Sequence, residues 1–268
     1  LAGLTRILTV EPLPGAADDP RLKSIDQWLP DDGGATRHVP RDAAALRAHL
    51  TTLGFDDARQ LEAGLLVRRE ESDELRARFR GRLMFPIADT SGRVAGFGGR
   101  VIGQGEPKYL NSPESLAFTK GKLLYGLHWA RNAIRRAERV LLVEGYFDLV
   151  RLSAAGVEEV VAPLGTALTS DQAALIVRYS KNVFLLYDSD KAGLKATFRA
   201  GDELLRHGAS VRVVTLPSGE DPDTYARKAG REGIERHLGE ALDVFERKIQ
   251  LLERGGWFAD LHRRRRAI

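Results

Sequence analysis

The sequence contains no cysteine among its 268 residues. The absence of cysteine excludes disulfide bonds and thiolate metal sites, and it fits a reducing compartment. No apolar run approaches the ~20 residues that span a bilayer, and the first residues lack the basic flank and apolar stretch of a secretory signal. These absences predict a cytoplasmic protein with no membrane partner. Because the chain begins at Leu1, we also expect it to be part of a longer protein.

Three common enzyme signatures are missing as well. The sequence has no Gly-x-x-x-x-Gly-Lys phosphate loop, no complete Gly-x-Gly-x-x-Gly fingerprint and no obvious nucleophile elbow. The 43% of hydrophobic residues nevertheless suffices for a buried core, in one large domain or in two to three small domains.

Acidic residues are scarce in one part of the chain. Residues 76–139 contain thirteen Lys and Arg against four Asp and Glu, a net charge of +9, whereas the rest of the chain carries −5. A basic part next to an acidic part suits a protein that holds a polyanion in one region and divalent cations in the other. An ordinary solvated surface is the alternative, and charge alone does not separate the two.

The N-terminal third predicts irregular structure, then helices, then a hairpin. Residues 1–41 are rich in proline, glycine and aspartate, which predicts a poorly structured lead-in. Leucines at helical spacing, the last of them Leu65, predict short helices over residues 42–70. The stretches RLMFPIAD and VAGFGGRVI, joined by DTSGR, predict a hairpin. Glycines at Gly96, Gly98 and Gly99 weaken its second strand, unless a bend requires them or a ligand approaches the backbone closely.

From residue 139 onward, apolar strands alternate with helices. RVLLVEG, EEVVAPLG, NVFLLYD and SVRVVTLP predict buried strands, and helical segments follow, one of them with Thr169 or Ser170 as its N-cap. This alternation predicts a parallel sheet with right-handed crossovers. Apolar residues at helical spacing between Ile234 and Leu252 predict one long amphipathic helix at the C-terminal end.

The predicted fold class is therefore α/β. It combines a mixed α+β N-terminal subdomain, a parallel sheet with flanking helices, and a C-terminal helical segment. The expected boundaries are 1–41 for the lead-in, 42–137 for a basic subdomain that binds template or nucleotide, 138–225 for the sheet domain, and 226–268 for the helical segment.

Acidic residues follow three of the four predicted strands. Glu144 ends the first strand, Asp188 and Asp190 follow the third, and Asp221 and Asp223 come just after the fourth. Ligands of open parallel sheets collect beyond the carboxyl ends of the strands. Each aspartate alone could be a helix N-cap, but carboxylates that gather at one edge repel one another and become tolerable when a cation lies among them.

Oxygen ligands without cysteine predict a hard metal ion, Mg²⁺ or Mn²⁺, that stays partly hydrated. Acids with such an ion beside a basic region point to phosphoryl transfer on a nucleic acid or nucleotide.

The residues that carry these patterns resemble a known family. Glu144-Gly145 followed by Asp188-x-Asp190 is similar to the Toprim signature of bacterial primases, topoisomerases and some nucleases. EGYFDL, PLGTALT, LLYDSDKAG and GEDPDTYARKAG resemble DnaG-type bacterial primases, as do RFRGRLMFPI, GRVAGFGGRVI, PKYLNSPE and FTKGKLLYG upstream. The resemblance runs from about residue 50 to about residue 230, and residues 1–41 do not take part in it.

The resemblance implies roles for individual residues. It implies catalytic metal binding at Glu144, Asp188 and Asp190, with Asp148, Asp221 and Asp223 in the same acidic cluster. Whether Glu144 is a ligand or a general acid/base stays open. The resemblance also implies template or nucleotide contacts at Arg78, Arg80, Arg100, Lys108, Tyr109, Asn111 and Lys120.

The implied activity is synthesis of RNA primers on a single-stranded DNA template from ribonucleoside triphosphates during replication, with Mg²⁺ or Mn²⁺. The implied location is the bacterial cytoplasm, in association with the nucleoid. DnaG-type primases also have a zinc-binding domain and a domain that contacts the replicative helicase, and we expect both to be absent from this chain. The alternatives are a Toprim-type nuclease or topoisomerase fragment, and a non-catalytic module that binds single-stranded DNA. The acids count against the pure binding module, because they would repel its ligand.

Overall fold

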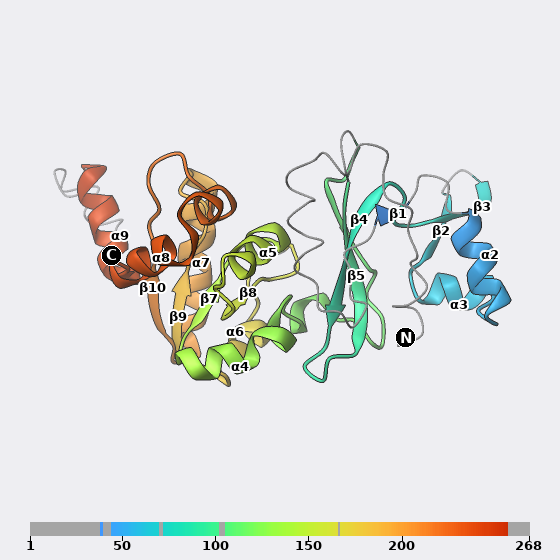
Figure 1. The fold of residues 1–268 in the computed structure, drawn as a ribbon, viewed down its shortest axis with the longest axis horizontal. Helices are drawn as coiled ribbons and strands as arrows, with labels where there is room; N and C mark the ends of the chain where they lie inside the picture. Colours follow the sequence, from blue (N-terminus) through green and yellow to red (C-terminus); the bar gives the residue numbers. More distant parts are fainter. Residues whose placement is uncertain (1–37, 40–43, 70–71, 102–104, 166, 257–268) are drawn as a thin grey trace. The chain divides into compact units, whose positions relative to one another are not determined.

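The computed structural model describes residues 38–39, 44–69, 72–101, 105–165 and 167–256. The chain forms two compact units, which divide between His128 and Trp129 (Figure 1). Most of the predicted lead-in, residues 1–37 and 40–41, lies outside the described residues, and so does the end of the C-terminal segment, residues 257–268. The domain boundaries expected from the sequence remain predictions.

Unit 1 contains an antiparallel sheet and a separate hairpin. The sheet has the order β1–β4–β5–β6, formed by His38–Val39, Arg82–Ala88, Val94–Val101 and Tyr109–Asn111. The hairpin pairs β2 (Leu66–Arg69) with β3 (Ser72–Ala77). The remaining elements are α2 (Ala44–Thr52), α3 (Asp57–Glu62) and a 3-10 turn at Lys120–Lys122. The predicted hairpin of β4 and β5 is confirmed.

The prediction for residues 42–70 is only partly right. Helices α2 and α3 are present, but Leu65 does not belong to a helix, and the segment that begins at Leu66 is the strand β2. The sequence of this hairpin, LVRREESDELRA, is mostly charged, and most residues of the two strands are exposed. A solvent-facing hairpin of this kind lacks the alternation of apolar residues that predicts a strand.

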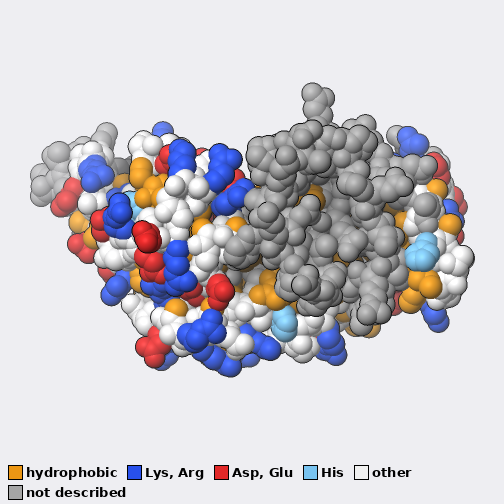
Figure 2. Space-filling model, in the orientation of Figure 1, with side chains coloured by type: hydrophobic (Ala, Val, Ile, Leu, Met, Phe, Trp, Pro, Cys, Tyr) orange, Lys and Arg blue, Asp and Glu red, His pale blue; other side chains and the backbone are white. Residues whose placement is uncertain are grey.

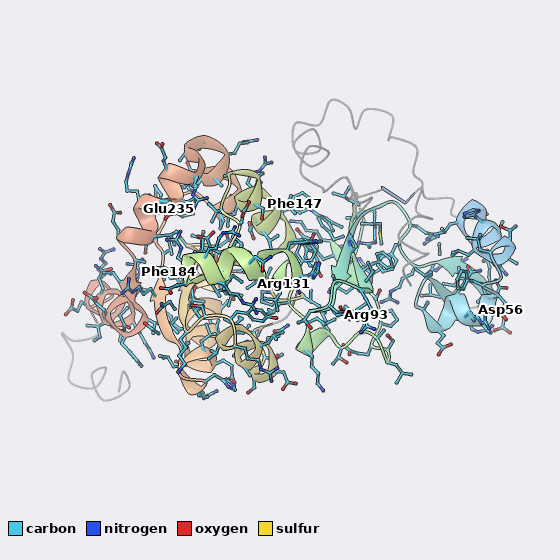
Figure 3. The ribbon with its side chains drawn as sticks, turned by 60° about the horizontal axis from the view of Figure 1, so that its bottom comes forward. Asp56, Arg93, Arg131, Phe147, Phe184 and Glu235 are labelled. Carbon is cyan, nitrogen blue, oxygen red and sulfur yellow. The ribbon has the colours of Figure 1, made fainter. Side chains whose placement is uncertain are left out.

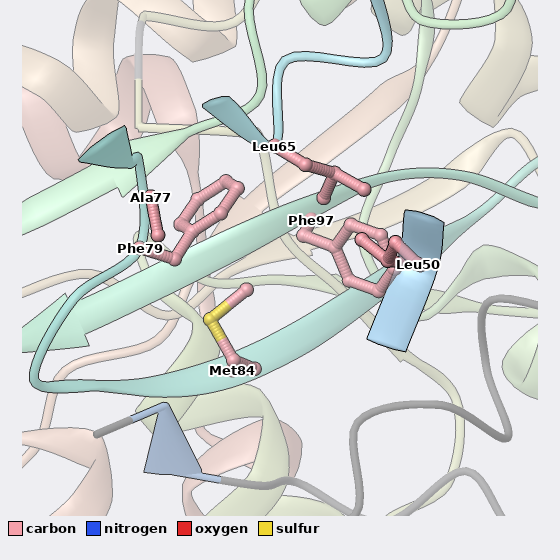
Figure 4. Packing of buried hydrophobic residues seen from close by; sticks show 6 residues of the cluster. All are labelled: Leu50, Leu65, Ala77, Phe79, Met84 and Phe97. Atoms are coloured by element: carbon pink, nitrogen blue, oxygen red, sulfur yellow. The ribbon is translucent and has the colours of Figure 1, made fainter. Parts of the chain in front are cut away.

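The core of unit 1 fills the space between the sheet, α2 and the β2–β3 hairpin. Phe79 and Phe97 meet edge to face, with ring centroids 6.4 Å apart. Figure 4 shows the buried cluster, which comprises Leu50, Leu65, Ala77, Phe79, Met84 and Phe97.

Packing against aromatic rings explains two of the glycines of β5, Gly96 and Gly99. A Cβ atom at Gly96 would lie 2.6 Å from the ring of Phe118, and one at Gly99 would lie 2.9 Å from the ring of Phe79. Real Cβ contacts are longer, so any larger residue at either position would displace a buried ring.

Unit 2 is built around a five-stranded sheet with the order β11–β10–β9–β7–β8. Four strands are parallel, namely β7 (Val140–Leu142), β8 (Val160–Val161), β9 (Asn182–Leu185) and β10 (Ser210–Val213). The helices are α4 (Leu127–Ala137), which starts two residues before the division, α5 (Tyr146–Ala154), α6 (Ser170–Val177), α7 (Lys191–Arg206), α8 (Pro222–Gly239) and α9 (Val244–Arg254). The predicted parallel α/β sheet is confirmed. Helix α5 packs against α8, whereas α7 packs against α6 and α9.

Side-chain caps fix where helices begin. Thr169 caps α6, as predicted, by accepting a hydrogen bond from the backbone N–H of Gln172 at 3.2 Å. Asp243 caps α9 in the same way, by accepting from the N–H of Phe245. Strand residues such as Leu141, Val183 and Val211 are fully buried, which accounts for the apolar runs of the sequence.

The prediction of one long C-terminal helix is wrong. Helix α8 ends at Gly239, and the next residues form β11 (Leu242–Asp243), an antiparallel edge strand in which Leu242 pairs with Val213. A separate helix, α9, then starts at Val244. The apolar spacing was misleading here, because Phe245 and Ile249 on α9 are exposed and Val244 is the apolar residue that α9 buries.

The strand order creates a switch point between β7 and β9. From β7 the chain crosses to β8 on one side, and it then returns to add β9 and β10 on the other side. In open parallel sheets, the loops that leave the two strands at such a point diverge and open a crevice at the carboxyl edge. The segments that follow β7 and β9 therefore border the position where a ligand is expected.

Candidate metal and nucleic-acid sites

The acidic residues gather at the carboxyl edge of the sheet of unit 2. Glu144 follows β7, Asp188 and Asp190 follow β9, and Asp221 and Asp223 follow β10. These three strands are adjacent and parallel, so the acids emerge on the same edge. This arrangement confirms the predicted common edge. The metal-binding role of the acids stays a prediction.

Asp148, on the first turn of α5, is the acid most affected by its neighbours. Burial, and after it the negative charges of Asp188, Asp221, Asp223 and Glu144, together raise its pKa to about 7. Four carboxylates therefore lie close enough to act electrostatically on a fifth. A cluster of this kind is strained at neutral pH in the absence of a cation.

Glu144 and Asp188 form the centre of the cluster. The backbone N–H of Asp188 donates to Oε1 of Glu144 at 3.4 Å, which links the two loops that border the switch point. Burial raises the pKa of Glu144, and the charge of Asp188 adds to the effect. Burial also raises the pKa of Asp188, and the charges of Asp221 and Asp190 add to it.

Two of the aspartates have a structural task as well. Asp190 is the N-cap of α7 and accepts from the backbone N–H of Gly193 at 2.7 Å. Asp221 is the N-cap of α8 and accepts from the N–H of Thr224 at 2.6 Å. A cap uses one carboxylate oxygen, and the second oxygen stays available to a ligand.

Sequence reasoning missed the partner of Asp223. Arg151, on α5, donates from Nε to Asp223 at 2.7 Å, and only 11% of the arginine side chain is exposed. This ion pair joins α5 to α8 and partly neutralises Asp223, which makes it less available to a cation than the other acids. The signal was the position of Arg151 three residues after Asp148, which places both on one side of the helix.

Gly193, the glycine of DSDKAG, was missed too. A Cβ atom at this position would lie 2.2 Å from the carbonyl oxygen of Asp188. The first turn of α7 therefore packs directly on the backbone of Asp188, which holds that residue at the end of β9. Only glycine permits this approach.

We expect Gly193→Ala to destabilise the protein by about 2 kcal/mol or more, because the clash involves backbone atoms that cannot yield without moving Asp188. Urea unfolding would measure the loss. Gly239→Ala is the matched control, since no atom lies within 4 Å of a Cβ there and the change is expected to be neutral or slightly stabilising. Equal stability of the two variants would contradict the packing role of Gly193.

In unit 1, Arg78 is held by Asn111. Its Nε and Nη2 atoms both donate to the backbone carbonyl of Asn111, at 3.1 and 2.9 Å, and burial lowers the pKa of the guanidinium. The two residues thus form a pair that connects the segment after β3 to β6. Their predicted contact with template or nucleotide is untested.

Half-buried Arg100 and exposed Tyr109 form a pair on β5 and β6. They are directly opposite in the ladder, and the guanidinium of Arg100 lies 5.4 Å from the ring centroid of Tyr109, which is 38% exposed. Lys108, next to Tyr109, is exposed as well. A flat aromatic ring beside cations suits contact with bases and phosphates of a single strand.

Buried Arg82 was not predicted, and it supports this pair. Its guanidinium donates to the carbonyls of Pro107 at 2.7 Å, Gly99 at 3.2 Å and Lys108 at 3.4 Å. It thereby fixes the segment that presents Lys108 and Tyr109. Two further predicted contacts lie elsewhere in unit 1: Arg80 is exposed beside a hollow of about 850 Å³ next to α2 and β3, and Lys120 begins the 3-10 turn.

Two family models match most of the described chain. The model of the DNA primase catalytic core, N-terminal domain, matches residues 37–131, and a Toprim-like model matches residues 141–226. A DNA primase of Halalkalibacterium halodurans is 46% identical over 195 residues, which is 72% of this chain and 33% of that protein.

Solved structures agree with these matches. The Aquifex aeolicus primase, with its zinc-binding and RNA polymerase domains, superposes with a TM-score of 0.77 at 37% identity, covering 89% of this chain and 60% of that one. The DnaG primase catalytic domain bound to ssDNA superposes with a TM-score of 0.75 at 36% identity, covering 94% of this chain and 84% of that one. The chain belongs to the DnaG-type primase family.

The chain corresponds to the catalytic core of this family and spans about a third of the length of the curated primases that it matches. No helix in the described ranges of this primase core is long and apolar enough to cross a membrane. The mixed α/β architecture of the described residues is that of the primase catalytic core.

Toprim-type primases depend on metal ions, and the donor set of this primase core fits a hard cation. No three carboxylate or imidazole groups in the described ranges converge as a ready-made metal site. A magnesium ion, however, commonly takes only one or two carboxylates and completes its shell with water and substrate phosphates. The Glu144–Asp188 centre, with Asp190 beside it, meets this smaller requirement.

Proposed function

We propose that this chain synthesises RNA primers on single-stranded DNA by metal-dependent nucleotidyl transfer. The 3′-hydroxyl of the growing strand attacks the α-phosphate of a ribonucleoside triphosphate, and pyrophosphate leaves. The observation that carries the proposal is the acidic cluster at the switch point of the sheet, in a chain that belongs to the primase family.

Glu144, Asp188 and Asp190 would hold the metal, which we propose to be Mg²⁺ or Mn²⁺. Such an ion supplies positive charge to the phosphoryl oxygens and to the attacking hydroxyl. The hydrogen bond from the Asp188 N–H orients the carboxylate of Glu144. Asp148, Asp221 and Asp223 add negative charge around the ligands, which strengthens the attraction for the cation.

The residues of unit 1 would contact the polyanionic substrates. Tyr109 offers a ring for a base, and its neighbours Arg100 and Lys108 offer charge for phosphates. Buried Arg82 keeps these groups in place. The other proposed contacts with template or triphosphate are Arg78, Arg80, Asn111 and Lys120.

Partners and location follow from the family and are proposals for this chain. The DnaG catalytic domain of known structure binds ssDNA, and we propose single-stranded DNA as the template here. Ribonucleoside triphosphates as substrates, a replicative helicase as partner and a cytoplasmic location at the nucleoid are proposed with it.

The test is template-directed incorporation of labelled ribonucleotides on single-stranded DNA. We expect RNA products only with template and with Mg²⁺ or Mn²⁺, and we expect calorimetry to detect triphosphate binding only when the metal is present. Metal-dependent nicking of supercoiled DNA, without triphosphate binding, would instead support the Toprim nuclease alternative and contradict the proposal.

A further inference from the structure

The amino edge of the sheet in unit 2, opposite the acidic edge, carries a loop that is fixed to the end of α4. Two side chains of this loop hydrogen-bond to the carbonyl of Glu138: Oγ of Ser180 donates at 2.8 Å, and Nδ2 of Asn182 donates at 3.0 Å. The backbone N–H of Asn182 also donates to Ser180 at 3.1 Å. The loop is therefore held in one position relative to α4.

This junction exposes a group of cations that have no acidic partner. Arg135 on α4 and Arg178 and Lys181 on the loop are exposed, and no carboxylate in the described ranges lies within 4 Å of their charged nitrogens. The guanidinium of Arg135 lies 5.7 Å from the ring centroid of half-buried Tyr179. We call these four residues the amino-edge patch. Figure 2 shows Lys and Arg side chains gathered over α4, at the lower rim of unit 2.

Neighbouring arginines differ from the patch because they are neutralised. Arg136 pairs with Glu158 at 3.1 Å. Arg139 pairs with Glu159 at 2.6 Å and with Glu235 at 2.5 Å, and it is largely buried. The charges of the amino edge thus fall into a structural set, which holds α4 and α8 to the sheet, and an exposed set, which has no such task.

A small hollow of about 270 Å³ lies on the same edge, beside the loop. It is lined by Asn182, Phe184, Ser210 and Arg212, together with Ala137 at the end of α4 and Glu138 and Arg139 after it. The guanidinium of exposed Arg212 lies 5.7 Å from the ring centroid of Phe184. Figure 3 shows Phe184 beside the C-terminal part of α4.

We propose that the amino-edge patch and this hollow form a second contact surface for single-stranded nucleic acid, apart from the acidic edge. Arg135, Arg178 and Lys181 bind phosphates of the strand, and the hollow receives one unstacked base against the flat guanidinium of Arg212. Guanidinium groups lie next to aromatic rings at two places, Arg135 with Tyr179 and Arg212 with Phe184. These flat groups favour the binding of a nucleic acid over an acidic protein segment, because bases stack on them and carboxylates do not. The proposal rests on the proposed function only in taking single-stranded DNA as a ligand of this chain.

The amino-edge patch also lies away from the acids of the carboxyl edge, which repel nucleic-acid phosphates. The carboxyl edge repels phosphates wherever a cation does not neutralise its acids. A strand held at the opposite, amino edge avoids this repulsion. The patch therefore offers a place where template or product is held without competing with the metal.

The test is the salt dependence of binding, measured with the whole chain and a fluorescent oligothymidylate. Each phosphate contact contributes about 0.7 to the slope of log K against log salt. The triple variant Arg135→Ala/Arg178→Ala/Lys181→Ala should therefore lower the slope by about 2. Its loss of affinity relative to the wild type should be about 100-fold larger at 0.1 M salt than at 1 M salt. Arg136→Ala is the matched control: the position is exposed on the same helix, its charge is already paired, and its slope should stay that of the wild type.

Single variants keep the test decisive if the triple variant is unstable. Arg178→Ala and Lys181→Ala should each lower the slope by about 0.7. Arg212→Lys keeps the charge but loses the flat surface, so it should weaken binding roughly five-fold without changing the slope. Unchanged slopes in folded patch variants would overturn the inference, since the arginines would then merely complement the C-terminal ends of α4 and α6.

Two further outcomes separate this inference from the proposed function. If Arg100→Ala/Lys108→Ala lowers the slope but the patch variants do not, only the second surface is refuted. If the wild type binds no single-stranded DNA at all, both proposals fall. Binding of poly-glutamate that depends on the patch, with DNA binding unaffected, would overturn the inference in favour of an acidic protein partner.

Discussion

Asp188→Asn and Asp190→Asn are each expected to lower ribonucleotide incorporation by more than about 100-fold at limiting Mg²⁺. Each change removes one negative charge from the cluster at the switch point, where the charges of both residues act on neighbouring carboxyls. The amide has nearly the same shape as the carboxylate, so the loss would come from the weaker attraction for the cation.

The fold should survive both changes. Asparagine is as good an N-cap as aspartate, so Asp190→Asn keeps the hydrogen bond that starts α7. The backbone contact of Asp188 with Glu144 does not depend on the side chain of Asp188. Circular dichroism and single-stranded DNA binding should therefore match the wild type.

Asp202→Asn is the matched control, because Asp202 is an exposed acid on α7 that acts on none of the cluster carboxyls. It should incorporate ribonucleotides at the wild-type rate. Near wild-type synthesis by either Asp188→Asn or Asp190→Asn at limiting Mg²⁺ would remove the basis for the metal assignment. Rescue of their activity by excess metal would support it.

The sheet of unit 2 was predictable because its signals are local. Buried strands such as β9 contain runs of consecutive apolar residues, and Thr169 caps α6 within four residues of sequence. The acids at the strand ends were predictable for the same reason. Parallel strands deliver their carboxyl ends to one edge whatever their order, so the common edge did not require knowledge of the topology.

Features that depend on distant pairing could not be predicted. The switch point requires the order of β7 and β9, and the break before α9 requires that Leu242 find Val213 on β10. The ion pair of Arg151 and Asp223 joins residues far apart in sequence. The position of Arg151 on α5 places it on the side of Asp148, but it does not identify Asp223 as the partner.

Glycines and buried arginines were harder still to interpret. Gly96 and Gly99 looked like openings for a ligand, yet aromatic rings from other segments occupy the space. Arg82 resembles its neighbours in the sequence, but it is buried and binds backbone carbonyls. Only the packing distinguishes an arginine that supports a surface from one that could contact a phosphate.

The last prediction concerns the cost of assembling the acidic cluster. We expect Asp148→Asn to stabilise the metal-free protein at neutral pH by about 2 to 4 kcal/mol. The pKa of Asp148 is raised to about 7 by burial and by the surrounding acids, against an ordinary value of 3.8. Asparagine is uncharged and still accepts the hydrogen bond from the backbone N–H of Gly145.

The sign of the pH dependence follows from the raised pKa. Between about pH 4 and pH 7 the unfolded chain loses the Asp148 proton while the folded chain keeps it, so the folded protein loses stability as pH rises through this range. Urea unfolding with EDTA, from about pH 5 to pH 8, should show this decline in the wild type and a much flatter curve in Asp148→Asn. Asp171→Asn, an exposed acid on α6, should follow the wild type.

Added Mg²⁺ should reduce the difference in stability between the wild type and Asp148→Asn. A cation among the acids offsets their repulsion, so it should stabilise the wild type more than Asp148→Asn, which has one charge fewer to offer. Identical pH profiles of the two proteins, or equal stabilisation by the metal, would mean that the acids of this edge act independently. They would then be separate helix caps and ion pairs, and the cluster would have no common ligand.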